Sequence, residues 1–131
     1  MKIVAIWLDD LRDPFETPWK EMIENNARGI DAVIWAKDVH EFQFHFEEVT
    51  KKSSMMLHSV FFDNDLGSTA KGSEGRNAFT WMEEQVRTRN IGVFGLHAQT
   101  ANVVAKKEIE SAFRVLKDYW NKETKVWRSN G

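Results

Sequence analysis

Cysteine is absent from this 131-residue chain, and proline occurs only twice. Without a thiol, the chain has no disulfide, no thiolate metal site and no cysteine nucleophile. The apolar run at residues 3–8 is too short for a signal peptide or a membrane span, and Asp9 and Asp10 follow it at once. We therefore expect a cytoplasmic protein with no membrane partner.

An excess of charge of either sign is also missing. Lys and Arg number 18 and Asp and Glu number 20, for a formal net charge of −2. A near-neutral chain gives no sign of a general DNA-binding or membrane-binding surface. The chain does have bulky apolar side chains, with six Trp and nine Phe, which suffice for a core. Its length predicts a single domain over residues 1–131.

Short apolar runs alternate with helical patterns along the chain. The runs predict strands at 3–8, 32–36, 60–62 and 91–96, with a weak fifth at 125–128. Apolar side chains at helical spacing predict helices from 18 to a stop near 29, over 39–49, over 74–86 and over 104–120. Alternation of strands and helices implies right-handed βαβ units. The predicted fold is a three-layer α/β sandwich of the flavodoxin kind, with a four- or five-stranded parallel sheet.

Two helix starts carry capping signals. Thr17 followed by Pro18 fits an N-cap with proline at the first helical position. Asp38 with Glu41 three residues later resembles a capping box. Phe44 interrupts the apolar face of this second helix, and residues 42–46 also fit an alternating strand. The cap favours the helix.

Polar side chains follow three of the predicted strands, although the strands themselves are almost entirely apolar. They are Asp9, Asp10 and Arg12 after the first strand, Asp63, Asn64 and Asp65 after the third, and His97, Gln99, Thr100 and Asn102 after the fourth. Parallel sheets of this kind bind ligands outside the carboxyl ends of their strands. These side chains are therefore the candidate site.

The acidic residues among them predict a metal site. First and third strands are usually neighbours in such sheets, so Asp9 and Asp10 should lie close to Asp63. Carboxylates packed together repel one another, and a cation relieves that repulsion. Oxygen ligands without cysteine suit Mg²⁺, Mn²⁺ or Ca²⁺ better than Zn²⁺. We expect Mg²⁺ or Mn²⁺ here, with a phosphate-bearing ligand.

Simpler interpretations stand beside this one. An Asp-Asp pair after a strand is commonly a turn or a helix cap. Arg12 either binds a phosphate or neutralises an aspartate. Thr100 and Asn102 either cap the last helix or offer its N-terminus to an anion. The glycine-containing stretch 66–75 is either a mobile lid or a plain surface loop.

The four histidines differ in their predicted placement. His40 and His45 fall on a predicted helix, as surface residues, and His58 precedes the third strand in a structural role. Only His97 lies near the candidate site.

Four motifs occur in order along the chain. They are Trp-Leu-Asp-Asp-Leu-Arg at 7–12 with Pro14, Trp-Ala-Lys at 35–37, Phe-Asp-Asn-Asp-Leu-Gly at 62–67 and Thr-Ala-Asn-Val-Val at 100–104. They resemble the cyclic-phosphate processing receiver-like domain, a small relative of response-regulator receivers found in bacteria and phages. The resemblance implies one receiver-like domain. It also implies hydrolysis or ring opening of cyclic phosphates on nucleotides or RNA ends.

The chain departs from that family pattern at two histidines. Asn64 stands where the family has the histidine of its Asp-His-Asp motif. The second family histidine aligns with Gln99, or with His97 after a two-residue shift. Histidine can transfer protons near neutral pH, whereas Asn and Gln cannot. The lysine that receivers carry after their fifth strand has no clear counterpart, since Lys125 precedes the predicted strand.

Three hypotheses follow. The first is a metal-dependent phosphoesterase with its metal on Asp9, Asp10 and Asp63, its catalytic groups at Asp63, Asp65 and His97, and its phosphate held by Arg12, Thr100 and Asn102. The second is a catalytically degenerate module that binds a protein partner. The third, and weakest, is a receiver phosphorylated on Asp63.

Overall fold

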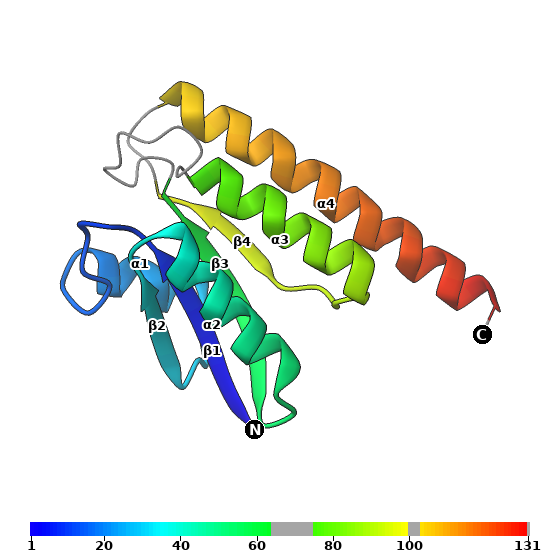
Figure 1. The fold of residues 1–131 in the computed structure, drawn as a ribbon, viewed down its shortest axis with the longest axis horizontal. Coiled ribbons are helices and arrows are strands. Elements are labelled where there is room, and N and C mark those ends of the chain that lie inside the picture. Colours follow the sequence, from blue (N-terminus) through cyan, green and yellow to red (C-terminus); the bar gives the residue numbers. More distant parts are fainter. Residues whose placement is uncertain (64–74, 100–102, 131) are drawn as a thin grey trace.

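Four strands and four helices alternate along the chain in the computed structural model (Figure 1). It describes the backbone of residues 1–63, 75–99 and 103–130, and the side chains of these residues except 105 and 124–130. The strands are β1 (Lys2–Leu8), β2 (Ala32–Ala36), β3 (Met55–Phe62) and β4 (Gly95–Ala98). The helices are α1 (Trp19–Asn26), α2 (Val39–Lys51), α3 (Gly75–Arg89) and α4 (Val103–Asn130).

The strands form one parallel sheet in the order β2-β1-β3-β4. This confirms the predicted α/β fold of the receiver and flavodoxin kind. In the centre of the sheet, Leu8 of β1 pairs with Ala36 on one side and with Phe62 on the other. The carboxyl ends of β1, β2 and β3 therefore lie level at one edge of the sheet.

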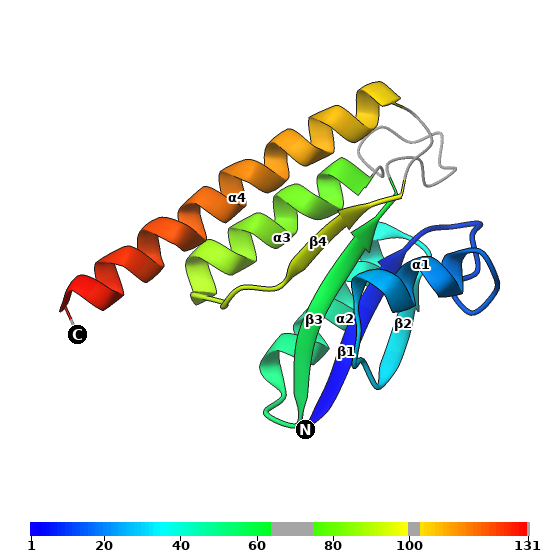
Figure 2. The ribbon, with the colours of Figure 1, turned by 180° about the vertical axis from the view of Figure 1, so that it is seen from behind.

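Helices cover both faces of the sheet and make three layers. Figure 1 views the side of α2, and Figure 2 views the side of α1. The larger core lies under α2, α3 and α4 and contains Leu8, Phe62 and Phe113. The smaller core lies under α1 and contains Trp7 and Phe61. Consecutive strand residues such as Trp7 and Leu8 enter opposite cores, because side chains alternate across a strand.

The structure confirms the predicted cap of α2 and corrects the predicted start of α1. Asp38 caps α2, and its side chain accepts from the backbone N–H of Glu41 at 2.8 Å. Residues 42–46 are helical, so the alternative strand is wrong. Phe44 points away from the apolar face of this helix and is 63% exposed. At α1 the prediction was one residue off: Pro18 is the N-cap, without a side-chain hydrogen bond, and the helix begins at Trp19.

The predicted fifth strand at 125–128 is wrong, because α4 continues to Asn130. Residues 103–130 contain neither glycine nor proline, so the sequence offers no residue that breaks a helix there. The fourth strand lies later than predicted, at Gly95–Ala98 instead of 91–96.

The apolar residues before β4 are nevertheless part of the fold. Ile91 donates its backbone N–H to Val86 at the end of α3, and its carbonyl accepts from the Trp120 indole at 3.1 Å. Phe94 is buried, with its ring centroid 5.1 Å from that of Trp120. Ile91 and Phe94 are therefore anchored in a connection between α3 and β4, whereas Val93 between them is exposed.

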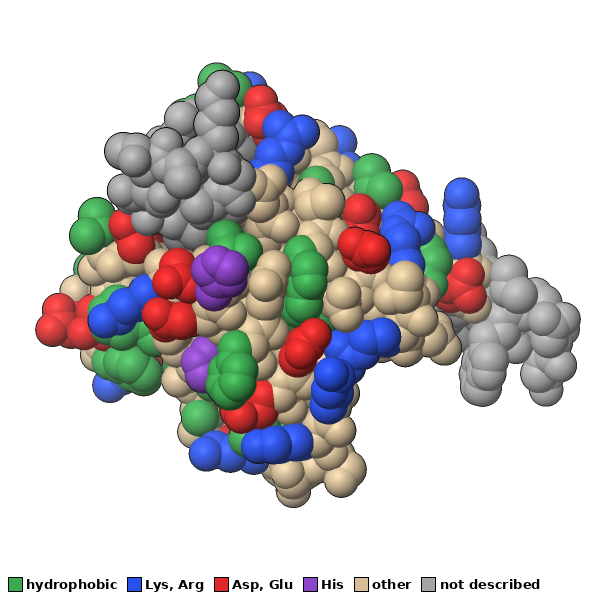
Figure 3. Space-filling view, in the orientation of Figure 1, with side chains coloured by type: hydrophobic (Ala, Val, Ile, Leu, Met, Phe, Trp, Pro, Cys, Tyr) green, Lys and Arg blue, Asp and Glu red, His purple; other side chains and the backbone are tan. Residues whose placement is uncertain are grey.

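The surface agrees with the balanced composition. On the α2 face, acidic and basic side chains are interspersed (Figure 3). Within the described part of the chain, no helix is both long and apolar enough to cross a membrane.

Candidate functional site

The hydrogen bonding of the sheet continues one residue past the ends of β1, β3 and β4. Asp9, Asp63 and Gln99 are the residues that follow these strands. Their backbone N–H groups donate, at 3.0, 3.0 and 2.9 Å, to the carbonyl oxygens of Ala36, Leu8 and Phe62. The sheet itself thus positions these three residues at its carboxyl edge.

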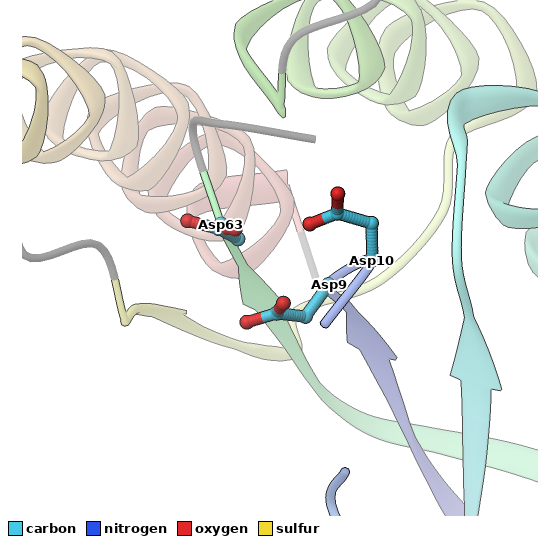
Figure 4. A group of neighbouring side chains, drawn as sticks. All are labelled: Asp9, Asp10 and Asp63. Atoms are coloured by element: carbon cyan, nitrogen blue, oxygen red, sulfur yellow. The ribbon is translucent and has the colours of Figure 1, made fainter. Parts of the chain in front are cut away.

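Three carboxylates meet at this edge. Asp9, Asp10 and Asp63 each offer an oxygen within 4.8 Å of the oxygens from the other two (Figure 4). Asp9 is 1% exposed and Asp63 is 6% exposed, while Asp10 is half-buried. The structure therefore brings together the three residues that the sequence predicted as metal ligands.

Local hydrogen bonds hold Asp9 and the loop after it. One carboxylate oxygen of Asp9 accepts from the backbone N–H groups of Leu11 and Arg12, both at 3.0 Å. This is an Asx-type turn, in which a short polar side chain satisfies its own following backbone. The Trp35 indole donates to the Asp9 carbonyl at 2.7 Å, and the Trp7 indole donates to the Arg12 carbonyl at 2.9 Å. The turn is consequently tied to the sheet by side chains from two neighbouring strands, β1 and β2.

Arg12 places a positive charge among the carboxylates. Its Nη1 lies 3.5 Å from Asp9 Oδ2 and 3.7 Å from Asp63 Oδ1. The same nitrogen donates to the Gln99 carbonyl at 2.7 Å. The guanidinium carbon sits 4.8 Å from the centre of the Trp19 ring. Of the two roles considered for Arg12, neutralising aspartates is the one that this geometry displays.

Gln99 supports the site in a way that sequence reasoning missed. It is 7% exposed, and its side-chain Nε2 donates to the Leu8 carbonyl at 3.1 Å. Its Oε1 has no hydrogen-bond partner among the described residues. Its backbone carbonyl accepts the hydrogen bond from the Arg12 guanidinium. The signal for this role was its position directly after the fourth strand, which had placed Gln99 in the candidate site without a stated task.

His97 lies on the α1 side of the sheet, apart from the group of three carboxylates. Its ring stacks on Phe61, with centroids 4.6 Å apart and planes at 20°. It lines a hollow between α1 and α4, and none of the three aspartates lines that hollow. Burial lowers the pKa of His97 below 6.5, and the charges of Lys117 and His58 lower it further.

The other predicted positions divide into two groups. His40 is exposed and His45 is half-buried, while His58 lies 3.2 Å from the hydroxyl of Ser59. Several predictions fall outside the described residues, namely Asn64, Asp65, Thr100, Asn102 and all of the predicted loop except Gly75. Gly75 is the first residue of α3.

Known proteins were compared with the chain. A family model described as the cyclic-phosphate processing receiver domain matches residues 4–115. The chain belongs to this family. The match runs from β1 into α4 and includes the three aspartates, Arg12 and Gln99. No curated protein and no solved structure matches the chain.

The site of this receiver domain fits a divalent cation. Its donors are carboxylate oxygens, which hard cations such as Mg²⁺ and Mn²⁺ prefer. Among the described residues, Arg12 supplies one positive charge against three carboxylates, and two of these carboxylates are buried. A divalent cation would balance the remaining negative charge. The buried Oε1 of Gln99 is a further oxygen without a partner among the described residues at this sheet edge.

Proposed function

We propose that this receiver domain hydrolyses cyclic phosphates on nucleotides or RNA ends, with Mg²⁺ or Mn²⁺ held by Asp9, Asp10 and Asp63. The observation that carries the proposal is the convergence of these three carboxylates within 4.8 Å, at the carboxyl edge of a parallel sheet. Family membership supplies the cyclic phosphate as substrate class. When bound, the cation would stabilise negative charge on the phosphoryl oxygens.

The chain's own residues would orient the ligand and move protons. Ring opening adds water across one P–O bond, so a base must take a proton from water and an acid must protonate the leaving oxygen. Asp63 and Asp65 are the proposed base and acid, and His97 is left out of this set because it lines the hollow on the α1 side of the sheet. Arg12, whose guanidinium is fixed by Gln99 and Trp19, would hold the phosphate together with Thr100 and Asn102.

A second function is favoured by Gln99. In the alignment that places Gln99 at the family's second histidine, its amide holds the Leu8 carbonyl, which is a structural task. Asn64 replaces the other histidine. A receiver domain that keeps its metal site and binds a protein partner, without turnover, is therefore the alternative. Phosphorylation on Asp63 gains no support, because the sheet that is described ends at β4 and leaves the receiver lysine unplaced.

A turnover screen separates the two functions. The purified protein is incubated with Mg²⁺ or Mn²⁺ and a panel of 2′,3′-cyclic and other cyclic phosphates. Asp63→Ala is the test variant, and Asp118→Asn, which changes an exposed aspartate on α4, is the matched control. Turnover lost only in Asp63→Ala supports the enzyme. No turnover in protein that still binds metal by calorimetry moves the assignment to the partner-binding module.

A further inference from the structure

Beside the edge strand β4 the surface has a hollow of about 400 Å³, flanked by α1 and α4. The ring of His97 lies at its base. The wall formed by α4 carries Lys106, Glu110, Arg114 and Lys117. Neither the proposed function nor the family match assigns a role to this hollow.

The charges on the α4 wall are not balanced. Lys106, Arg114 and Lys117 follow one stripe of the helix, at separations of eight and three residues, with Glu110 between them. Within the described part of the chain, none of the four forms an ion pair. Three positive charges against one negative charge give the wall a formal charge of +2. Such a surface attracts a multiply charged anion.

The positive wall also affects the pKa of His97, which lines the hollow. The pKa of His97 is lowered by burial first, then by Lys117 and by His58. The lowered pKa favours the uncharged ring, which offers one donor and one acceptor. Stacking on Phe61 at 4.6 Å holds the ring in place.

The edge of β4 adds backbone donors. Gln99 donates its N–H inward to Phe62 of β3. Because the direction of these groups alternates along a parallel strand, the N–H groups of Leu96 and Ala98 face the outer edge. Both residues line the hollow, and neither N–H has a partner among the described residues. Unpaired N–H groups beside cationic side chains suit phosphate oxygens.

We propose that this hollow is a second ligand site, distinct from the carboxylate cluster, which binds a phosphate monoester on a hydroxyl-bearing carrier. The dianion has three acceptor oxygens for Arg114, Lys117 and the outward N–H groups of β4. Glu110 lies on the same wall and accepts a hydrogen bond from a hydroxyl of the carrier, which selects a sugar phosphate over a bare anion. The volume is that of a small-molecule pocket.

The test uses the whole chain with a chelator present, so that no divalent metal bridges an anion to the aspartates. Ribose 5-phosphate, inorganic phosphate and ribose are titrated while the ring resonances of His97 are followed by NMR. The exposed His40 serves as a spectator. We expect saturable shifts at His97 with ribose 5-phosphate, weaker binding of inorganic phosphate, and none of ribose. Absence of shifts at His97 with both phosphates overturns the proposal.

Charge variants on one helix locate the site. Arg114→Gln and Lys117→Gln should each weaken ribose 5-phosphate binding by about tenfold, since each removes a charge-assisted hydrogen bond. Lys107→Gln is the matched control, because Lys107 is exposed on α4 and does not line the hollow. An equal loss in Lys107→Gln would mean unspecific attraction and would refute the site. Glu110→Gln should narrow the preference for ribose 5-phosphate over inorganic phosphate. An unchanged preference contradicts the role of Glu110.

Discussion

Arg12 and Gln99 are joined by a 2.7 Å hydrogen bond from the guanidinium to the backbone carbonyl, although 87 positions separate them in the sequence. The bond connects the turn after β1 with the residue after β4, across β3 between them. The same nitrogen, Nη1, lies near Asp9 and Asp63. The Gln99 carbonyl therefore helps to hold the positive charge of Arg12 beside these two carboxylates.

Replacing Arg12 should destabilise the fold until a cation takes over its charge. In Arg12→Gln, two buried carboxylates lose the guanidinium charge that lies 3.5 and 3.7 Å from them, and we expect a loss of about 2–4 kcal/mol in the free energy of unfolding. Urea denaturation in chelator measures this. Saturating Mg²⁺ should recover more stability in the variant than in the wild type. Arg28→Gln, at an exposed position between α1 and β2, should behave as wild type. If Mg²⁺ restores no more stability to the variant than to the wild type, Arg12 and the cation do not balance the same carboxylate charge.

Gln99→Ala should leave the Leu8 carbonyl without its side-chain partner. The carbonyl keeps the Asp63 N–H at 3.0 Å, so the variant loses one hydrogen bond, worth about 0.5–1.5 kcal/mol, which thermal or urea unfolding would detect. Gln43→Ala provides the comparison, since Gln43 is half-buried on α2 and makes no side-chain hydrogen bond within the described part. Equal losses of unfolding free energy in both variants would show that the hydrogen bond to the Leu8 carbonyl adds no stability.

Asp10→Asn should separate metal binding from folding. Asp10 makes no hydrogen bond or ion pair with a described residue, in contrast to Asp9, which holds the turn. We expect Asp10→Asn to keep the wild-type unfolding midpoint in chelator and to bind Mg²⁺ about tenfold more weakly, because one carboxylate ligand is lost. Calorimetry of the metal-free protein gives the affinity. Unchanged Mg²⁺ affinity would remove Asp10 from the ligand set.

His97 should make the stability depend on pH on the acid side of neutrality. Its pKa in the folded state lies below the unfolded value of 6.5, so the unfolded state binds the proton more readily. The free energy of unfolding should therefore be highest above pH 6.5, fall as the pH drops below 6.5, and level off below the folded pKa.

His97→Phe isolates this effect, because it keeps an aromatic ring against Phe61 and removes the titrating group. The comparison is the difference in unfolding free energy between pH 7.5 and pH 5.5 in the two proteins. The wild type should lose more stability than the variant over this interval. Equal losses would show that other groups account for the acid dependence.

The sequence by itself determined the layers and most of the site. Continuous apolar runs identified three strands because a strand buried on both faces has no polar alternation, as Trp7 and Leu8 show. Strand ends then predicted that Asp9, Asp10 and Asp63 would meet, since parallel strands bring their carboxyl ends to one edge. Asp38 marked the start of α2 because capping is a local interaction between a side chain and the backbone three residues later.

Other features were decided only by tertiary structure. Whether residues 91–94 pair with a neighbouring strand or form a connection between α3 and β4 depends on β3 and Trp120, and local hydrophobicity is the same in both cases. The same limit made residues 125–128 resemble a strand, although they continue α4. Three placements depend on groups that are distant in sequence. Arg12 lies between two aspartates, the Gln99 side chain donates to the Leu8 carbonyl, and His97 lines a separate hollow. Periodicity reports which side chains are buried, whereas the partner of each buried polar group is known only once the strands are side by side.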